Sequence, residues 1–330
     1  MNQESYYEQN DMKKYESILL QGYKNNAYSH ASLTILKPNL DQISLSLKES
    51  QEKLFDLASI TKLYTTAIIL RLAENNTLDL QQEIENFLPN YKGSDLKFID
   101  LLSHNVDYGF PVGQLRKEFG DNFYSEIAKL DVSVKPLGKT NYNNLGFIHL
   151  GIIIEQIYGN NLGDVFRSFF GEHGLKNTFA GDNLPIQKQF APTEIVDGRM
   201  IRGITHDETA RLMNGVAGHA GIFSTSQDVA LFGQKWMDYE IVSQEFFERN
   251  ILKNYDEASP QSLGFWLRIP SLPNYNNRFL SHSGFTGGLL ALDLETQTVV
   301  SILNNRTIHG RDNQKHREVW GRILSEIDNI

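Results

Sequence analysis

The chain has 330 residues and a formal net charge of −9, with 40% hydrophobic and 22% charged residues. That length allows one large domain or two lobes, and that apolar content supports a sizeable core and excludes global disorder. The sequence contains no cysteine, which excludes disulfides, cysteine nucleophiles and thiolate metal sites. It also shows no basic block and no apolar run of about 20 residues, so we expect neither a nucleic-acid partner nor a membrane span.

The first residues are polar and acidic, and they show neither a signal peptide nor an anchor. We therefore expect a cytoplasmic protein, or an extracytoplasmic one if a leader has been removed. The sequence carries no signal for a particular oligomeric state.

Hydrophobic periodicity predicts helices and strands at both ends of the chain, with a helical middle. The first elements are a helix, two strands and the strongest helix of the chain, at 12–23, 31–36, 43–47 and 59–74. The middle, about 75–215, reads as helices and loops, with a clear helix at 145–158 that Gly159 ends. A capping-box pattern, Ser224-Thr-Ser-Gln227, then opens a helix at 227–237.

The C-terminal part is rich in strands again and closes with a helix. We expect strands at 263–269, 278–283, 288–294 and 298–303, a hairpin turn at 294–298, and an amphipathic helix at 319–327. The simplest assembly is an α+β fold, in which both ends of the chain build one antiparallel sheet flanked by the N- and C-terminal helices. In this single domain, residues 1–74 and 216–330 form a sheet lobe, residues 75–215 form an inserted helical lobe, and a ligand site lies in the cleft between them.

A Ser-x-x-Lys pattern occurs three times, so at least two of its copies are accidental. Ser59-Ile-Thr-Lys62 stands apart because it opens the strongest helix of the chain. The offset of three residues puts Ser59 and Lys62 on one helical face, and the free N–H groups of a helix start suit a nucleophile that develops an oxyanion. The competing interpretation is a capping serine followed by a solvated lysine. The other copies are Ser50/Lys53 and Ser94/Lys97.

Two further patterns lie at the ends of predicted elements. Tyr142-Asn-Asn144 precedes the helix at 145–158, where the tyrosine could shuttle protons and Asn144 could hold a substrate carbonyl or cap the helix. His282-Ser-Gly284 ends a predicted strand, where Gly284 would let a substrate lie against the strand edge. The N–H of the next residue, Phe285, is a candidate oxyanion donor. A second His-x-Gly pattern is His219-Ala-Gly221, and a lone histidine is more often structural.

The order and spacing of these patterns resemble the class C β-lactamase and penicillin-binding-protein family of serine hydrolases, which also contains D,D-peptidases, D-amino-acid amidases and esterases. The likeness covers about residues 30–305, through blocks at 55–62, 78–80, 87–89, 142–147, 218–225 and 282–287. The sequence departs from the family pattern in three places. Asn143 replaces a small residue, and His282 stands where the typical β-lactamases carry lysine. Residues 100–104 resemble a further family block, but Asn105-Val-Asp-Tyr follows them in place of the usual Thr-Ser-Gly.

The resemblance implies a β-lactamase/transpeptidase-like fold and an acyl-enzyme route that requires no metal or cofactor. In that route Ser59 attacks a carbonyl, and Lys62 takes its proton directly or through Tyr142. Backbone N–H groups of Ser59 and Phe285 hold the oxyanion. The substrate-binding residues are then Asn144, His282, Gly284 and Phe285.

Several substrates are compatible with this scaffold, because fold does not fix the reaction. Our first expectation is a carboxypeptidase- or β-lactamase-like hydrolase of D-amino-acid peptides, amides or β-lactams. The second is a carboxylic-ester hydrolase, and the third is a non-turnover penicillin-binding or regulatory module. An imidazole has an ordinary pKa of about 6.5, so His282 would present a positive charge to a substrate carboxylate only when it is protonated. This argues against an efficient β-lactamase.

Overall fold

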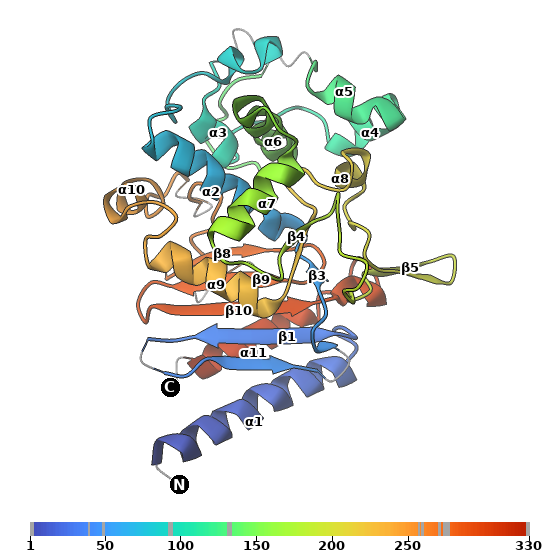
Figure 1. Cartoon of the computed structure of the whole chain (residues 1–330), viewed down its shortest axis with the longest axis vertical. Coiled ribbons are helices and arrows are strands. Elements are labelled where there is room, and N and C mark those ends of the chain that lie inside the picture. Colours follow the sequence, from blue (N-terminus) through green and yellow to red (C-terminus); the bar gives the residue numbers. More distant parts are fainter. Residues whose placement is uncertain are drawn as a thin grey trace.

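A five-stranded antiparallel sheet joins the two ends of the chain in the computed structural model (Figure 1). Its order is β2-β1-β10-β9-β8. The strands are β1 (Ala31–Leu36), β2 (Ile43–Ser46), β8 (Phe279–Ser283), β9 (Leu289–Asp293) and β10 (Thr298–Asn304). β1 pairs with β10 so that Ala31 lies opposite Asn304, and this pairing confirms the predicted union of the two termini in one sheet.

The structure describes most of the chain. The described residues are 3–38, 40–47, 50–91, 95–130, 134–256, 258, 261–269, 272 and 278–327, and side chains are described from Met12 onward. None of the helices in this described part is both long enough and apolar enough to cross a membrane.

Helices cover both faces of the sheet (Figure 1). α1 (Gln3–Lys24) and α11 (His316–Ile327) pack against each other and against one face, while α9 (Ser226–Met237) covers the other. Successive residues of a strand point to opposite faces. Leu290 and Leu292 therefore join the core under α9, whereas Leu289 and Ala291 join the core under α1 and α11.

The middle of the chain builds a second layer of helices against α2 (Thr61–Glu74). α6 (Leu145–Tyr158) packs on α2 and on α7 (Leu162–Glu172), and all three share one hydrophobic core with α9. The shorter helices are α3 (Phe98–Leu102), α4 (Val112–Phe119), α5 (Phe123–Ile127), α8 (Glu208–Leu212) and α10 (Gln244–Asn250). The division into lobes at residues 74/75 and 215/216 stays a prediction.

Short strands lie in this middle part, which the sequence predicts as helices and loops only. β4 (Phe179–Ala180) joins β3 (Phe55–Asp56) and β7 (Ile222–Ser224), which lie outside the middle part, in a small sheet, and β3 leads directly into the turn that carries Ser59. β5 (Glu194–Val196) and β6 (Arg199–Ile201) form a hairpin that projects from the molecule (Figure 1).

The predicted strand at 263–269 is wrong. Gly264 adopts a φ of +73°, and the N–H of Ser262 bonds the carbonyl of Phe265 at 2.8 Å. A left-handed residue turns the chain and ends any extended ladder. Within the described residues, the segment instead meets β8 at an isolated bridge between Trp266 and Ser281, and Ser281 Oγ also donates to the carbonyl of Arg268.

The start of α9 also differs by one residue from the predicted capping box. Thr225, not Ser224, is the N-cap, because its side chain accepts the N–H of Asp228 at 3.3 Å. Ser224 belongs to β7 instead.

Candidate active site

Ser59 lies in a one-turn 3-10 helix, Ala58–Ile60, just before α2. Ala58 adopts a φ of +46°, a left-handed conformation that costs a non-glycine residue about 1–2 kcal/mol. Asp56 holds this turn, because its buried carboxylate accepts the N–H of Ala58 at 2.8 Å and that of His206 at 2.7 Å. Burial raises the pKa of Asp56, although these two N–H groups oppose the rise. The turn leaves Ser59 only half-buried.

Lys62 is fully buried, and its Nζ meets three oxygen acceptors. It donates to Ser59 Oγ at 2.9 Å and to Asn144 Oδ1 at 2.9 Å, and the carbonyl oxygen of His219 lies 3.5 Å away. Three acceptors match the three N–H bonds of an ammonium group. The structure thus brings the predicted nucleophile, lysine and asparagine into direct contact.

The two asparagines before α6 have separate tasks. Asn143 Oδ1 accepts the N–H of Gly146 at 3.0 Å, which caps the helix. Asn144 makes no capping hydrogen bond and points to Lys62. Asn143, at which the sequence departs from the family pattern, therefore caps the helix, and the side-chain amide of Asn144 contacts Lys62 instead.

The aromatic ring of Tyr142 lies beside the Lys62 side chain. The side chain is 42% exposed, and its ring centroid lies 4.9 Å from Lys62 Nζ. The ring stacks on Trp266 at 5.7 Å and lies 4.5 Å from the ring of His104. The Tyr142 hydroxyl makes no hydrogen bond to any residue that the structure describes, so its part in proton transfer stays a prediction.

His282 is buried in the same group of rings, 6.2 Å from Tyr142. Its Nδ1 donates to the carbonyl of Ser283 at 2.9 Å, so Nε2 is an acceptor, and Nε2 has no hydrogen-bond partner within the described chain. Burial and the nearby Lys62 ammonium lower the pKa of His282 to about 3. The expectation that His282 becomes a cation near pH 6.5 is therefore wrong, because this buried imidazole stays neutral there.

Gly284 lets the end of β8 touch the turn before Ser59. A Cβ on Gly284 would lie 2.4 Å from the carbonyl oxygen of Leu57, so a side chain would force the strand away. Thr286 adds a second link, since its Oγ1 donates to the carbonyl of Asp56 at 2.7 Å. Because Gly284 has no side chain, the end of β8 can lie directly against the turn that carries Ser59.

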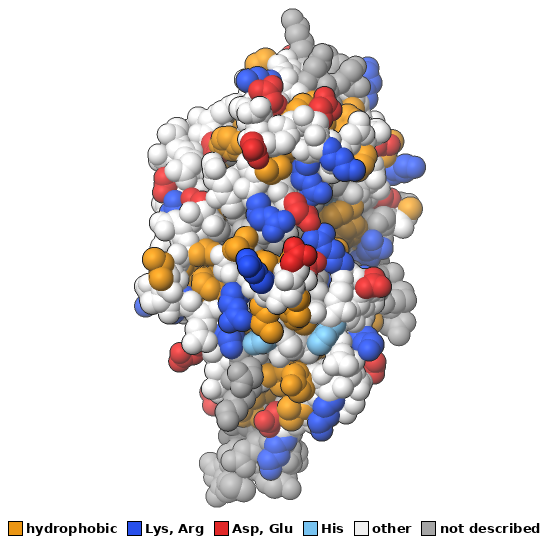
Figure 2. All heavy atoms as spheres, turned by 90° about the vertical axis from the view of Figure 1, so that its right-hand side faces the viewer, with side chains coloured by type: hydrophobic (Ala, Val, Ile, Leu, Met, Phe, Trp, Pro, Cys, Tyr) orange, Lys and Arg blue, Asp and Glu red, His pale blue; other side chains and the backbone are white. Residues whose placement is uncertain are grey.

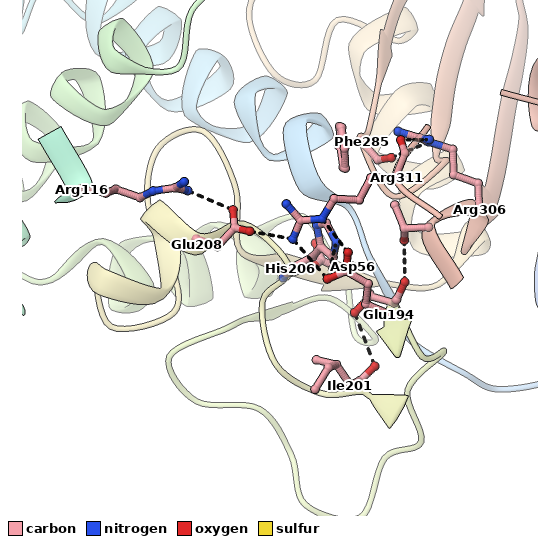
Figure 3. A network of polar contacts seen from close by, with 11 residues as sticks. Asp56, Arg116, Glu194, Ile201, His206, Glu208, Phe285, Arg306 and Arg311 are labelled. Atoms are coloured by element: carbon pink, nitrogen blue, oxygen red, sulfur yellow. Dashed lines mark hydrogen bonds and ion pairs between the residues drawn. The ribbon is translucent and has the colours of Figure 1, made fainter. Parts of the chain in front are cut away.

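The ring of Phe285 contacts a histidine and an arginine (Figure 3). It stacks on His206 with ring centroids 5.6 Å apart, and the guanidinium carbon of Arg306 lies 4.6 Å from the Phe285 ring centroid. Arg306 Nε also donates to the carbonyl of Phe285 at 2.7 Å. Neither Ser59 nor Phe285 donates its backbone N–H to a described residue. Both N–H groups therefore remain candidate oxyanion donors.

Five of the predicted residues open onto one cavity of about 260 Å³, and Lys62 and Asn144 lie behind Ser59. The five are Ser59, Tyr142, His282, Gly284 and Phe285. The other described lining residues are Trp266, Arg268, Ser283, Arg306, Gln314, His316, Arg317 and Trp320. This lining includes three arginines and no carboxylate, in a protein whose net charge is −9.

The far end of this cavity holds donors that other side chains do not use. Arg317 Nε and Trp320 Nε1 are buried and have no hydrogen-bond partner among the described residues. Burial and the charges of Arg306 and Arg317 lower the pKa of His316 to about 3, so this histidine is neutral. Sequence reasoning missed these residues, because nothing local marks the first turn of the last helix as part of a site.

Ion pairs link the segment after β10, which contacts the cavity-lining Arg306, to the middle of the chain (Figure 3). Arg311 donates from Nε to Glu194 at 2.5 Å and from a terminal nitrogen to Glu208 at 2.6 Å. Glu208 also accepts from Arg116 at 2.9 Å. Figure 2 shows basic and acidic side chains interspersed across the middle of the face that bears the β5–β6 hairpin. These pairs link α4, α8 and β5 to the segment that follows β10.

The other copies of the motifs have different surroundings. Ser50 is buried, and its Oγ accepts the N–H of Ala31 at 3.0 Å. Ser94 lies outside the described residues. The described residues contain no group of three or more His, Asp or Glu side chains arranged to hold a metal ion.

Comparison with known proteins identifies the family. The family described as Beta-lactamase matches residues 46–323. A Salmonella typhi protein provisionally named D-alanyl-D-alanine carboxypeptidase is 27% identical over an alignment 313 residues long, and the match covers 79% of this chain and 71% of that protein. Two solved structures share the fold, the octameric penicillin-binding protein homologue of Pyrococcus abyssi and the D-amino acid amidase of Ochrobactrum anthropi.

The two structural matches are distant in sequence but extensive. The Pyrococcus abyssi protein has a TM-score of 0.75 at 18% identity, covering 97% of this chain and 78% of that one. The Ochrobactrum anthropi amidase has a TM-score of 0.71 at 19% identity, covering 97% and 99%. These matches confirm the predicted fold. The chain therefore belongs to the Beta-lactamase family of serine hydrolases, the membership that its three motifs predict.

Proposed function

We propose that this hydrolase forms an acyl-enzyme on Ser59 and prefers acyl donors that carry a carboxylate, such as peptides that end in a D-amino acid. The observation that carries the proposal is the contact of Lys62 Nζ with both Ser59 Oγ and Asn144 Oδ1 at 2.9 Å. This contact lies at a cavity with three arginines and no acidic side chain in its described lining.

The proposed reaction has two covalent steps. Ser59 Oγ attacks the substrate carbonyl carbon, and its proton passes to Lys62 after the ammonium has lost one proton, or to Tyr142 as phenolate. The C–N bond of the tetrahedral intermediate then breaks, and the leaving amine takes that proton. Water next adds to the acyl-Ser59 ester, which releases the carboxylic acid and returns the proton to Ser59.

The arginines support the choice of a carboxylate-bearing substrate. A carboxylate accepts two parallel hydrogen bonds from a guanidinium, and hydrogen bonds to charged groups contribute about 1.5–3 kcal/mol. Arg317 brings a buried Nε that lacks a described partner, whereas Arg306 is engaged by the carbonyls of Phe285, Arg311 and Asn313. We therefore assign Arg317 to the substrate carboxylate.

A comparison of variants tests this assignment. Arg317→Gln should lower kcat/KM for a D-alanyl peptide by about 10- to 100-fold, the effect of one lost charged hydrogen bond, and should change a neutral ester by less than about twofold. Arg322→Gln on the same helix is the matched control, because Arg322 lines a separate cavity with Gln21 and Asn25. Equal losses on both substrates would contradict a carboxylate subsite.

A carboxylic-ester hydrolase is the second candidate, and the neutral state of His282 favours it. The typical β-lactamases carry a permanent cation at this position, and a neutral imidazole does not replace it. A panel of neutral esters, D-amino-acid amides and cephalosporins discriminates the two candidates by kcat/KM. A covalent penicillin adduct that never hydrolyses would instead support a non-turnover module. A cytoplasmic location and the lack of a nucleic-acid partner stay predictions.

A further inference from the structure

A histidine and a carboxylate lie behind Lys62, outside the lining of the cavity. His219 belongs to the second His-x-Gly motif, which the proposed mechanism does not use. Its side chain is fully buried, and its Nε2 lies 2.9 Å from Asp207 Oδ1. An ionised carboxylate only accepts hydrogen bonds, so Nε2 carries the proton. The carbonyl oxygen of His219 faces Lys62 Nζ at 3.5 Å.

The backbone around His219 is pressed against the two helices that supply the site. The carbonyl of Gly218 accepts a hydrogen bond from Thr65 Oγ1 of α2 at 2.7 Å. A Cβ on Gly218 would lie 2.0 Å from the carbonyl oxygen of Phe147 in α6. His219 is therefore fixed between the helix that carries Lys62 and the helix that follows Asn144.

Asp207 supplies a negative charge close to the buried ammonium. Burial alone would raise the pKa of Asp207, but His219, backbone N–H groups and the Lys62 ammonium together hold it well below its usual value. Asp56 faces Asp207 from the nucleophile turn, and burial raises the pKa of Asp56, so Asp207 is the more readily ionised of the two.

The other titratable groups that face Lys62 are Tyr142, His104 and His282. Burial and the Lys62 charge lower the pKa of both histidines well below the ordinary value, so both are neutral. A buried charge is tolerated only when another charge or several hydrogen bonds compensate it. Asp207 is the ionised carboxylate that His219 connects to Lys62, and its charge interacts electrostatically with the Lys62 ammonium.

We propose that Asp207 and His219 are positioning residues, which hold Lys62 between Ser59 and Asn144 and favour its charged form in the free enzyme. The inference rests on the proposed function, because it assigns Lys62 to proton transfer. A simpler role exists for Asp207, since its Oδ1 also accepts the N–H groups of Thr209 and Ala210 at 2.9 Å and so caps α8. The test must therefore separate charge from capping.

Asp207→Asn makes this separation, because asparagine caps helices as well as aspartate does but carries no charge. The readout is the rate constant for labelling by a fluorophosphonate between pH 5.5 and 10. In that reaction Ser59 Oγ bonds phosphorus, fluoride leaves, and the serine proton passes to the base. No natural substrate is needed.

Removal of the negative charge makes Lys62 easier to deprotonate. The limb of the pH profile that Lys62 controls should therefore move to lower pH by about one unit, the usual effect of one nearby charge. This is the acid limb if neutral Lys62 is the base, and the alkaline limb if charged Lys62 supports Tyr142. The melting temperature should stay within a few degrees of wild type, because the cap is kept.

Glu208→Gln is the matched control, because Glu208 lies next to Asp207 on α8 but pairs with Arg311 and Arg116. It should move neither limb. If Asp207→Asn does not fold, Asp207→Ser replaces it as another good cap without charge. Unchanged limbs in the folded Asp207 variant would overturn the proposal and leave Asp207 as a cap. Absence of label on Ser59 in the wild type would instead refute the proposed function, and the inference would fall with it.

Discussion

Lys62 is a buried charge that contacts the nucleophile, so its loss should affect the reaction directly. Tyr142 lies over the same ammonium group. We expect Lys62→Ala and Tyr142→Phe each to lower kcat/KM by at least about 10²-fold, the low end for general acid–base catalysis. Steady-state kinetics on a D-alanyl peptide and a neutral ester measures this loss. Turnover close to wild type in either variant would assign proton transfer to another residue.

The neighbouring asparagines offer a matched pair of substitutions. Asn143→Ala should lower the free energy of unfolding by about 1 kcal/mol, because it removes a helix cap. Asn144→Ala should leave stability nearly unchanged and lower kcat/KM at least tenfold, roughly the effect of one lost hydrogen bond to a charged group. Urea unfolding and kinetics on the same samples separate the two effects. The opposite assignment of the losses would contradict the division of tasks.

His282 should contribute no ionisation to the pH profile near neutrality. Burial and Lys62 lower the pKa of His282 to about 3, so the imidazole stays neutral from pH 5.5 to 9. We expect the profiles of kcat/KM for wild type and His282→Gln to have the same shape over that range, whatever their heights. An inflection near pH 6.5 that only the wild type shows would mean that His282 is charged after all.

At the scale of elements, the contact between β8 and the nucleophile turn depends on Gly284. Gly284→Ala should lower the free energy of unfolding by about 1–3 kcal/mol, because the new methyl group meets the Leu57 carbonyl. The substitution should also slow the labelling of Ser59 by a fluorophosphonate, because it moves β8 away from the nucleophile turn. Gly321→Ala is the control, since the nearest atom to its Cβ lies at 3.5 Å and alanine favours a helix by about 1 kcal/mol. Equal stability of the two variants would refute the close contact.

At the scale of the whole molecule, buried neutral histidines should make the fold sensitive to acid. Burial is the main cause that lowers the pKa of His149 to about 4 and those of His282 and His316 to about 3. Below pH 6.5 the unfolded chain binds protons that the folded chain does not. Each histidine then removes up to about 1.4 kcal/mol of unfolding free energy per pH unit, between pH 6.5 and its folded pKa.

Urea unfolding at pH 7, 6 and 5 measures this loss, and stability should fall by at least about 2 kcal/mol across that range. His316→Asn should flatten the slope, because it removes one buried histidine. The exposed His309 provides the control, and His309→Asn should leave the slope as it is. A stability that is constant from pH 7 to pH 5 would show that these histidines take up protons in the folded state.

The sequence predicts best what depends on short-range pattern. The Ser59–Lys62 contact follows from a spacing of three residues, and the sheet follows from alternating apolar residues at both ends of the chain. Motif order also identifies the family. The strand predicted around Trp266 fails because one left-handed glycine outweighs β propensity.

The rest of the site depends on packing between distant segments. Asp207, His219 and Arg317 reach the site from the N-cap of α8, a turn before β7 and α11. The sequence marks His219 only as part of a second His-x-Gly copy, and no local pattern indicates that these residues meet Lys62 or the cavity. The neutral state of His282 likewise follows from burial rather than from residue type. Burial and long-range contact are tertiary properties, which is why single-sequence reasoning finds the motif residues and misses their surroundings.

The central claim is that Ser59 is the nucleophile, and mass spectrometry of the labelled protein tests it most directly. After reaction with a fluorophosphonate, proteolysis should yield one modified peptide, with the adduct on Ser59. Ser59→Ala should abolish the label while its circular dichroism and melting temperature match those of the wild type. An adduct on Ser50 or Ser94, or a label that persists in Ser59→Ala, would contradict the account.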